Sequence, residues 1–338
     1  MLATSAATGR SNVHILVVGG AGYIGSHMVR YLQERDHKVT VLDNLSTGYR
    51  EAVGSAHLIE ADLADRDALL RTLSADPYDG VMHFASFIQV GESVSDPSKY
   101  YRNNVTNTQN LMDAMVATQT NNLVFSSTAA IFGDPEYSPI DERHRKAPIN
   151  PYGRSKWMVE QMLDDYDRAY NLRSVRLRYF NAAGAHPSGE LGECHEPETH
   201  LIPLILQAAT GQRKNIKIFG RDYPTADGTC VRDYIHICDL ASAHELALKR
   251  LMSRQKTECF NLGNGQGFSV QEVVDIAKKV SGVDFEVIDD VRREGDPATL
   301  VADSSRARSE LGWQPEFDAL ETIIEHAWRF ERDRFQRS

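Results

Sequence analysis

The feature that most constrains the fold of this 338-residue chain is a regular alternation of short apolar runs with helix-forming segments in its first half. The apolar runs lie at 13–18, 39–43, 57–62, 81–85, 123–127 and 174–180, and the longest helical patterns lie at 24–35, 97–118 and 152–170. The first run, VHILVV, is apolar throughout, which is typical of a strand buried on both faces. Strand–helix alternation with short connections predicts an α/β fold with a doubly wound parallel sheet of the Rossmann type.

The second half of the chain is less regular and predicts a smaller, discontinuous α/β domain for substrate binding. Residues 183–232 are rich in Gly, Pro and His, which indicates loops and one helix near 201–210. Further helices are expected near 270–280 and 320–332 and a strand near 285–288, while the apolar segments 234–251 and 259–263 are expected to rejoin the sheet. We predict one domain of residues 1–182 plus 234–263 and a second of residues 183–233 plus 264–338, placed over the carboxyl edge of the sheet, where ligands bind in such folds.

Composition and charge exclude several kinds of partner. The net charge of −10 argues against nucleic acid, and the apolar runs are too short to span a membrane. Residues 1–12 are small and polar and indicate a disordered lead rather than a signal peptide. The four cysteines, Cys194, Cys230, Cys238 and Cys259, form no CxxC pair and match no zinc-binding Cys/His spacing, so they predict reduced thiols in a cytoplasmic protein and no metal site.

A glycine-rich stretch, GGAGYIGSH at 19–27, follows the first expected strand and begins the first helix. Gly19, Gly22 and Gly25 allow a tight turn and close approach of a ligand to the backbone, and the helix N-terminus then offers free N–H groups to a phosphate. The spacing is GxxGxxG rather than the usual GxGxxG, so the stretch alone is a weak signal for a dinucleotide.

Two carboxylates strengthen the interpretation of the glycine-rich stretch. Asp43 ends the next strand 18 residues after Gly25, close to the spacing of a carboxylate that binds an adenosine ribose. Asp62 ends the third strand, where the adenine is expected to lie. Because the Asp43 carboxylate would repel a 2′-phosphate, we predict NAD rather than NADP as the cofactor.

A second stretch, NPYGRSKWMVEQ at 150–161, places Tyr152 and Lys156 four residues apart and so on one face of the expected helix. An ammonium beside a phenol favours the phenolate and lowers the tyrosine pKa, which suits Tyr152 to act as a general base. Oxidation of an alcohol needs such a base while hydride passes to a nicotinamide. Thr128, in FSSTAA after the fifth strand, offers a hydroxyl at the same edge of the sheet.

The motifs together resemble a known family. GGAGYIGSH, FSSTAA, YGRSK, RYFNAAGAHPSG, FGRDYPTADGTCVRDYIH and RREGD are similar to the extended short-chain dehydrogenase/reductases over about 13–335, and AGAHPSG and GTCVRDYIH are more specific to the UDP-glucose 4-epimerase (UDP-galactose 4-epimerase) group. The resemblance implies an isomerase that interconverts UDP-glucose and UDP-galactose in galactose and carbohydrate metabolism. It does so by oxidation at C4, rotation of the 4-keto sugar and re-reduction, with NAD retained.

The resemblance assigns roles to the catalytic residues and the cofactor contacts. Tyr152 removes the proton of the sugar 4-hydroxyl, Lys156 lowers its pKa and holds the nicotinamide ribose, and Thr128 replaces a family serine that hydrogen-bonds the reacting oxygen. Ile88 stands where the best-known members have a lysine, and the neighbouring Gln89 is the candidate replacement. The implied cofactor contacts are Gly19, Gly22, Tyr23, Ile24, Gly25, Asp43, Asn44, Leu45, Ser46, Thr47, Gly48, Asp62, Leu63, Phe84, Ala85, Ile88, Asn103, Tyr152, Lys156 and Phe180.

The resemblance also implies how a UDP-hexose is bound. Arg232 and Arg293 supply cations for the pyrophosphate, and Leu300 limits the bulk of the sugar, so that N-acetylated sugars are disfavoured. His200 stands where many members carry asparagine, so its protonation is expected to matter near pH 6.5. Besides Thr128 and Tyr152, the implied substrate contacts are Asn181, His200, Leu201, Lys217, Phe219, Arg232, Arg293, Asp296 and Leu300, with 217–219 at the uracil and Asp296 at the uridine ribose.

Three other functions remain open at this point. A sugar-nucleotide 4,6-dehydratase carries Asp-Glu after the threonine of FSSTAA, where this chain has Ala129 and Ala130. A 4-epimerase of UDP-xylose/UDP-arabinose or of UDP-N-acetylhexosamines would differ only in pocket details. A non-enzymatic dinucleotide sensor would tend to lose Tyr152 or Lys156, and both are present.

The family also implies a homodimer in which two helices of each subunit form a four-helix interface. The two expected helices at 97–118 and 152–170 carry an apolar set, although such stripes usually face the sheet. The members of this set are Leu111, Met112, Met115, Met158, Met162 and Leu163.

Overall fold

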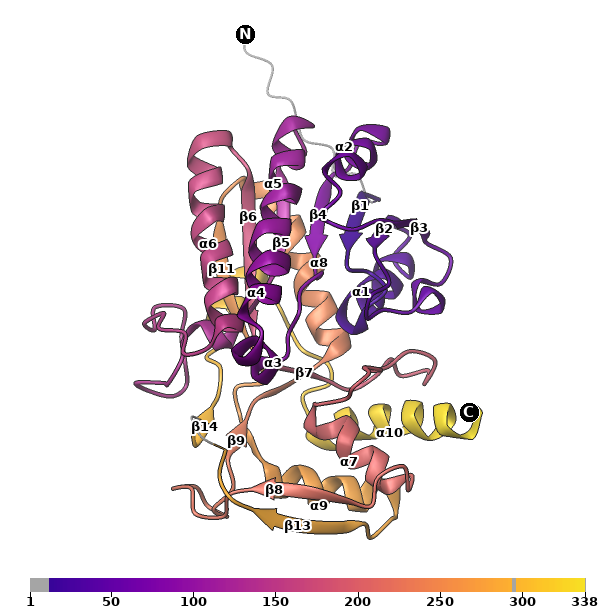
Figure 1. Cartoon of the computed structure of the whole chain (residues 1–338), viewed down its shortest axis with the longest axis vertical. Helices are drawn as coiled ribbons and strands as arrows, with labels where there is room; N and C mark the ends of the chain where they lie inside the picture. Colours follow the sequence, from indigo (N-terminus) through magenta and orange to yellow (C-terminus); the bar gives the residue numbers. More distant parts are fainter. Residues whose placement is uncertain (1–11, 294–295, 338) are drawn as a thin grey trace.

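A parallel sheet of seven strands forms the centre of the computed structural model, which describes residues 12–293 and 296–337 (Figure 1). The strand order is β11-β6-β5-β4-β1-β2-β3, as the doubly wound fold predicts. The strands are β1 (His14–Val18), β2 (Lys38–Asp43), β3 (His57–Glu60), β4 (Gly80–His83), β5 (Asn122–Thr128), β6 (Arg173–Tyr179) and β11 (Glu258–Leu262). Most of the lead expected at residues 1–12 and positions 294–295 of the RREGD motif lie outside the described residues.

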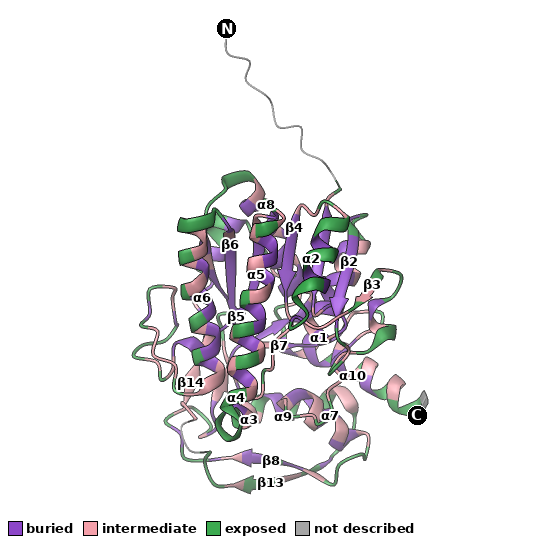
Figure 2. Cartoon of the chain, turned by 45° about the horizontal axis from the view of Figure 1, so that its top comes forward, coloured by how far each residue is buried: buried purple, intermediate pink, exposed green. Residues whose placement is uncertain are grey.

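Helices cover both faces of this sheet, and alternate residues of each strand face opposite layers. In β1, Ile15 and Val17 pack with the layer of α1 (Tyr23–Gln33) and α8 (Ile237–Arg254). Leu16 and Val18 pack with the opposite layer. That layer consists of α2 (Arg66–Ala75), α5 (Asn107–Ala117) and α6 (Pro151–Tyr170). The strands are therefore buried on both sides, whereas the helices expose their outer faces (Figure 2).

The expected single helix at 97–118 is divided into three pieces. A short helix α4 (Pro97–Tyr100) follows α3 (Val90–Ser95) and continues through a π-helical turn, η2 (Tyr101–Thr106), into α5. Asn104, inside this turn, is buried and donates hydrogen bonds to Phe87 O (3.0 Å) and Ser155 Oγ (3.1 Å). Such bulges frequently occur at functional sites, and this one tethers the segment after β4 to α6.

The smaller part of the chain lies at the carboxyl ends of the strands (Figure 1). Its core is formed by α7 (Leu201–Ala209), α9 (Val270–Ser281) and α10 (Leu320–Arg337), with β8 (Asn215–Phe219) paired in parallel with β13 (Glu286–Asp290). Short strands complete it: β9 (Val231–Arg232) lies between β12 (Phe268–Ser269) and β14 (Thr299–Leu300), and β7 (Asn181–Ala183) pairs with β10 (Tyr234–His236). Besides η2, the described residues form the short helical turns η1 (Arg50–Val53), η3 (Ala129–Ile131) and η4 (Ala307–Leu311).

The sequence reasoning missed β8, because the segment 183–232 was expected to hold only loops and one helix. In β8, Ile216 and Ile218 are buried while Lys217 between them is exposed, which is the alternation typical of a half-buried strand. The five-residue length and the flanking polar residues obscured this signal.

The predicted division into two domains stays a prediction. Residues 234–262 contribute α8 and β11 to the larger part, as the returning apolar character suggests. Ala307, Leu311 and Trp313 also pack in that core, and the Trp313 indole donates a hydrogen bond to Asp239 O (2.9 Å) at the start of α8. The chain therefore crosses between the two cores once more near its end. No helix within the described ranges has the length and apolar character needed to cross a membrane.

Candidate active site

A cavity of about 740 Å³ lies between the carboxyl edge of the sheet and the smaller part. Its wall is built from residues at or just after the ends of six strands of the main sheet, which is where open α/β sheets bind ligands. These residues are Gly19 after β1, Asp43 at β2, Asp62 after β3, Phe84 and Ala85 after β4, Ser126 and Thr128 at β5, and Tyr179 and Phe180 at β6. The volume suits a bound cofactor or small molecule.

The glycine-rich turn between β1 and α1 requires glycine at Gly19 and Gly25. Gly19 has φ of +80°, and a Cβ on Gly25 would lie 2.0 Å from Gly19 O. The first turn of α1 has no side-chain cap and no acidic residue. Its free N–H groups and the positive end of the helix dipole therefore face the cavity, as a phosphate-binding site requires.

Asp43 fixes the shape of this turn. One carboxylate oxygen accepts a hydrogen bond from Ala21 N (2.9 Å) and the other from Leu45 N (2.8 Å). Asp62 lies beside it and accepts a hydrogen bond from Asn44 Nδ2 (2.6 Å). The two carboxylates predicted for an adenosine moiety thus share one end of the cavity.

Nearly all predicted cofactor contacts line the cavity. Two do not: Leu45 packs against the core, and Gly48 lies against Ala21, where a Cβ would approach Ala21 O to 2.6 Å. The predicted residues at the wall are Gly19, Gly22, Tyr23, Ile24, Gly25, Asp43, Asn44, Ser46, Thr47, Asp62, Leu63, Phe84, Ala85, Ile88, Asn103, Tyr152, Lys156 and Phe180, and Gln89 beside Ile88 also faces it.

The structure brings Thr128, Tyr152 and Lys156 together at this wall. Asn150 caps α6 by accepting a hydrogen bond from Gly153 N (2.8 Å), and Pro151 is suited to the first helical position. Gly153 lies so close to Ala130 that a Cβ would approach Ala130 O to 2.4 Å. This close packing sets the first turn of α6, with Tyr152, against the end of β5, with Thr128.

The pKa pattern differs from the sequence expectation. Burial raises the pKa of Tyr152, and only a hydrogen bond with Thr128 acts in the opposite direction. Burial also lowers the pKa of Lys156 to about 7, against the attraction of Glu160. The expected lowering of the tyrosine pKa by a lysine ammonium is therefore not the dominant effect here, because both groups are desolvated.

Lys156 is held in place by two hydrogen bonds. Its Nζ donates to Ser86 Oγ (2.8 Å) and to Ser126 O (2.8 Å), and its side chain is buried. Neither serine was named from the sequence, because nothing in the local pattern links them to α6.

A buried ion pair anchors α6 to the sheet one turn beyond Lys156. Glu160, fully buried, accepts hydrogen bonds from Arg178 Nε (2.9 Å) and Nη2 (2.5 Å) and from Ser127 Oγ (2.6 Å). Arg178 lies on β6 and Ser127 on β5, so this network joins three elements of the site. The four-residue spacing of Tyr152, Lys156 and Glu160 was the sequence signal that could have identified it.

The predicted substrate residues fall into two groups. Asn181, His200, Leu201, Asp296 and Leu300 line the cavity together with Thr128 and Tyr152. Lys217, Phe219, Arg232 and Arg293 do not reach its wall. Arg232 forms an ion pair with Asp296, the Arg293 guanidinium lies 4.0 Å from the centre of the Phe219 ring, and Lys217 Nζ is 2.9 Å from Asp290 Oδ2. These cationic side chains are therefore held by neighbouring acidic and aromatic groups beside the cavity.

His200 is not the near-neutral titrating group that the sequence suggested. Burial alone would lower the pKa of its ring, but Glu193 and Glu198 raise it to about 10. Neither glutamate was singled out from the sequence, because acidic residues in a loop are common and carry no signal alone.

The doubly wound sheet, the glycine-rich turn and the Tyr152–Lys156 pair define a dinucleotide-binding enzyme. Comparison with known proteins leads to the same class. The chain belongs to the NAD dependent epimerase/dehydratase family, whose sequence model matches residues 15–263. A UDP-glucose 4-epimerase of Rhizobium meliloti is 50% identical over 325 residues, covering 96% of this chain and 99% of the relative. The resemblance and the fold class predicted from the sequence are thereby confirmed.

Solved structures agree with the sequence relatives. The UDP-glucose 4-epimerase from Brucella ovis in complex with NAD is 47% identical with a TM-score of 0.92, covering 94% of this chain and 98% of that chain. The UDP-Glc/GlcNAc 4-epimerase from Campylobacter jejuni is 44% identical with a TM-score of 0.84, covering 95% of this chain and 99% of that chain. These likenesses extend over both parts of the molecule.

Proposed function

We propose that this protein is an NAD-dependent isomerase that interconverts UDP-glucose and UDP-galactose by inversion at C4 of the sugar. The observation that carries the proposal is the meeting of Thr128, Tyr152 and Lys156 at one cavity with an open glycine-rich helix N-terminus. The near full-length likeness to UDP-glucose 4-epimerases supports this particular reaction.

The cavity fits NAD by two independent features. The glycine-rich turn leaves no room for a Cβ at Gly25, and the uncapped first turn of α1 offers N–H groups to a pyrophosphate. The Asp43 carboxylate suits a ribose with free hydroxyls and opposes a 2′-phosphate. When bound, NAD accepts a hydride from the sugar carbon and returns it.

The residues of this chain supply the proton chemistry and the positioning. Tyr152 takes the proton of the 4-hydroxyl and later returns it, and Thr128 holds the reacting oxygen by a hydrogen bond. Lys156 is held by hydrogen bonds to Ser86 and Ser126 and in turn fixes the positions of these groups at the cavity wall. Asp296 at the cavity wall holds the nucleotide, and Arg232 and Arg293 lie beside the cavity; release of Arg232 from Asp296 would free a guanidinium for the pyrophosphate.

The proposal is tested with purified protein, UDP-galactose and no added cofactor, by following UDP-glucose formation with chromatography. Conversion is expected because the cofactor is regenerated in each cycle. If no conversion occurs even after NAD is added, the proposed reaction is wrong, and UDP-pentoses become the next substrates to examine.

A second candidate is epimerisation of N-acetylated or pentose UDP-sugars, which the likeness to the UDP-Glc/GlcNAc 4-epimerase favours. Leu300 lies at the cavity wall, on β14, and packs against the cluster of Ile131, Phe132 and Ile140. Leu300→Ala is expected to raise turnover of UDP-N-acetylglucosamine at least about tenfold, because the pocket gains room for the N-acetyl group. Turnover of both UDP-sugars is measured in parallel.

The matched control for this change is Ile149→Ala, since Ile149 also lines the cavity but is half exposed. It is expected to leave the ratio of the two turnovers unchanged. Equal turnover of UDP-N-acetylglucosamine by wild type and Leu300→Ala would refute the role given to Leu300.

We propose a homodimer and a cytoplasmic location by the same family likeness. Leu111, Met112, Met115 and Leu163 are fully buried against the sheet, so they cannot form the interface. Met158 on α6 is 43% exposed and Met162 is half-buried, so these two methionines remain as apolar contacts for a partner helix. Light scattering during gel filtration is expected to give twice the chain mass, and a monomer at micromolar concentration would contradict the dimer.

The four free cysteines suit the reducing compartment that a cytoplasmic location provides.

A further inference from the structure

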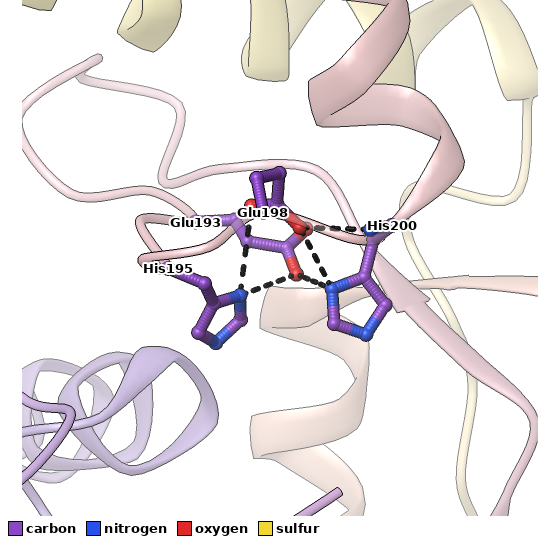
Figure 3. A group of neighbouring side chains, drawn as sticks. All are labelled: Glu193, His195, Glu198 and His200. Atoms are coloured by element: carbon purple, nitrogen blue, oxygen red, sulfur yellow. Dashed lines mark hydrogen bonds and ion pairs between the residues drawn. The ribbon is translucent and has the colours of Figure 1, made fainter. Parts of the chain in front are cut away.

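Two histidines and two glutamates converge in the loop between β7 and α7. Glu193, His195, Glu198 and His200 each offer one ligand atom, and these four atoms all lie within 4.8 Å of one another (Figure 3). Both imidazoles turn Nδ1 toward the carboxylates. Two carboxylates and two imidazoles that face one point need positive charge between them, which either two protons or one divalent cation supplies.

The distances within the cluster fit a tetrahedral cation site. Nδ1 of His200 lies 2.9 Å from Glu193 Oε1 and 3.0 Å from Glu198 Oε1. Nδ1 of His195 lies 3.3 Å from Glu193 Oε1 and 3.6 Å from Glu198 Oε2. A tetrahedron centred on zinc, with ligands about 2.1 Å away, has edges of about 3.4 Å, so these imidazole–carboxylate distances are close to those of such a site.

The contacts of His195 are compatible with a cation in the cluster. Nδ1 of His195 is buried and lies 3.3 Å from Glu193 Oε1 and 3.6 Å from Glu198 Oε2, so it is ion-paired with both carboxylates but meets the geometry of a good hydrogen bond with neither. A metal ion at the centre of the cluster would bind this nitrogen and both carboxylates directly.

We infer that Glu193, His195, Glu198 and His200 form a binding site for one zinc-class divalent cation. Two imidazole nitrogens and two carboxylate oxygens in a tetrahedral arrangement suit zinc better than calcium or magnesium, which prefer more oxygen ligands. The carboxylate of Glu198 is already oriented by hydrogen bonds from Thr199 N (2.7 Å) and His200 N (2.8 Å). Because the protein supplies four ligands, the site is structural rather than catalytic.

The position of the cluster indicates what the cation would stabilise. The loop from β7 to α7 contacts the outer side of α1: Tyr23 donates a hydrogen bond to Gly184 O (2.7 Å), and His27 Nε2 lies 3.2 Å from Leu191 O. The His195 ring meets the Tyr23 ring edge-on, with centroids 6.2 Å apart. Glu193, His195 and His200 also line the cavity, which gives an ion a path to the site. A cation would thus fix this loop against the helix that carries the glycine-rich turn.

The test uses full-length protein without an affinity tag, incubated with zinc, passed through gel filtration and analysed for bound metal by mass spectrometry. About one zinc per chain is expected for the wild type. His195→Gln and Glu198→Gln, which remove single ligands, are expected to weaken zinc binding on the order of 100-fold or more in competition with a chromophoric chelator. Their fold is checked by circular dichroism, and the direct measurement of zinc does not depend on enzymatic activity.

Two variants in the same loop serve as matched controls. His186→Asn removes a histidine that contacts Ser188 and lies outside the cluster. Cys194→Ser removes the thiol between two of the ligands, whose sulfur faces Arg334 instead. Both are expected to keep one zinc per chain. Wild-type protein with less than about 0.2 zinc per chain, or zinc bound equally well by folded His195→Gln, would overturn the inference and leave a cluster held by protons.

Discussion

Tyr152→Phe is expected to lower turnover of UDP-galactose about 10³-fold, because the change removes only the hydroxyl that exchanges the proton of the sugar 4-hydroxyl. This corresponds to about 4 kcal/mol of transition-state stabilisation. The aromatic ring stays, so packing against Thr128 and the cofactor cavity is retained. Turnover is measured by chromatography, and NAD content by absorbance after denaturation of the protein.

The control for this variant is Tyr170→Phe, at the exposed end of the same helix. It is expected to match wild type in turnover and in NAD content. Near-normal turnover of Tyr152→Phe would refute the assignment of the base, whereas loss of NAD together with activity would show that the change disturbed the cavity rather than the proton transfer.

Arg178→Met is expected to lower the free energy of unfolding by about 3–5 kcal/mol. The substitution removes both charge-assisted hydrogen bonds of the buried Glu160 carboxylate and leaves only Arg176, 3.9 Å away, as a cationic partner, and breaking a buried ion pair is strongly destabilising. Methionine preserves much of the side-chain volume, so a cavity contributes little. Chemical denaturation followed by circular dichroism measures the change.

Arg168→Met is the surface counterpart of this change. Arg168 pairs with Asp165 at 3.4 Å on the same helix, and both side chains are more than three-quarters exposed. Its loss is expected to change the unfolding free energy by less than about 1 kcal/mol. If Arg178→Met were no more destabilising than Arg168→Met, the Glu160 network would not anchor α6.

Features that depend on a few adjacent residues could be predicted from the sequence. The glycine-rich turn, Asp43 and the Tyr152–Lys156 spacing are local patterns, and each lies at the cavity where it was expected. The apolar runs predicted the positions of the strands of the main sheet, because a strand that is buried on both faces needs continuous apolar character.

Features that depend on distant residues could not be predicted in this way. Glu160 is paired with Arg178 on another element, and Lys156 is held by Ser86, 70 positions away. The pairing of Arg232 with Asp296, 64 positions away, likewise arises only after the loops are folded. The pKa of Tyr152 was expected to fall because the sequence reveals the neighbouring charge but not the loss of water around both groups.

Helix α6 carries both the catalytic tyrosine and its anchors to the sheet on one face. The residues on this face are Tyr152, Lys156, Glu160 and Asp164. Glu160 and Asp164 are fixed to Arg178 and Arg176 on β6, while Tyr152 lies in the first turn of the helix, eight residues or about 12 Å from Glu160. A tilt of about 5° at the anchored end would carry the tyrosine hydroxyl through about 1 Å, and a displacement of that size can slow a reaction on the order of a hundredfold. The arginines of β6 therefore help to fix the position of the Tyr152 hydroxyl. Substitutions at these arginines, far from the sugar, can slow the reaction by displacing that hydroxyl.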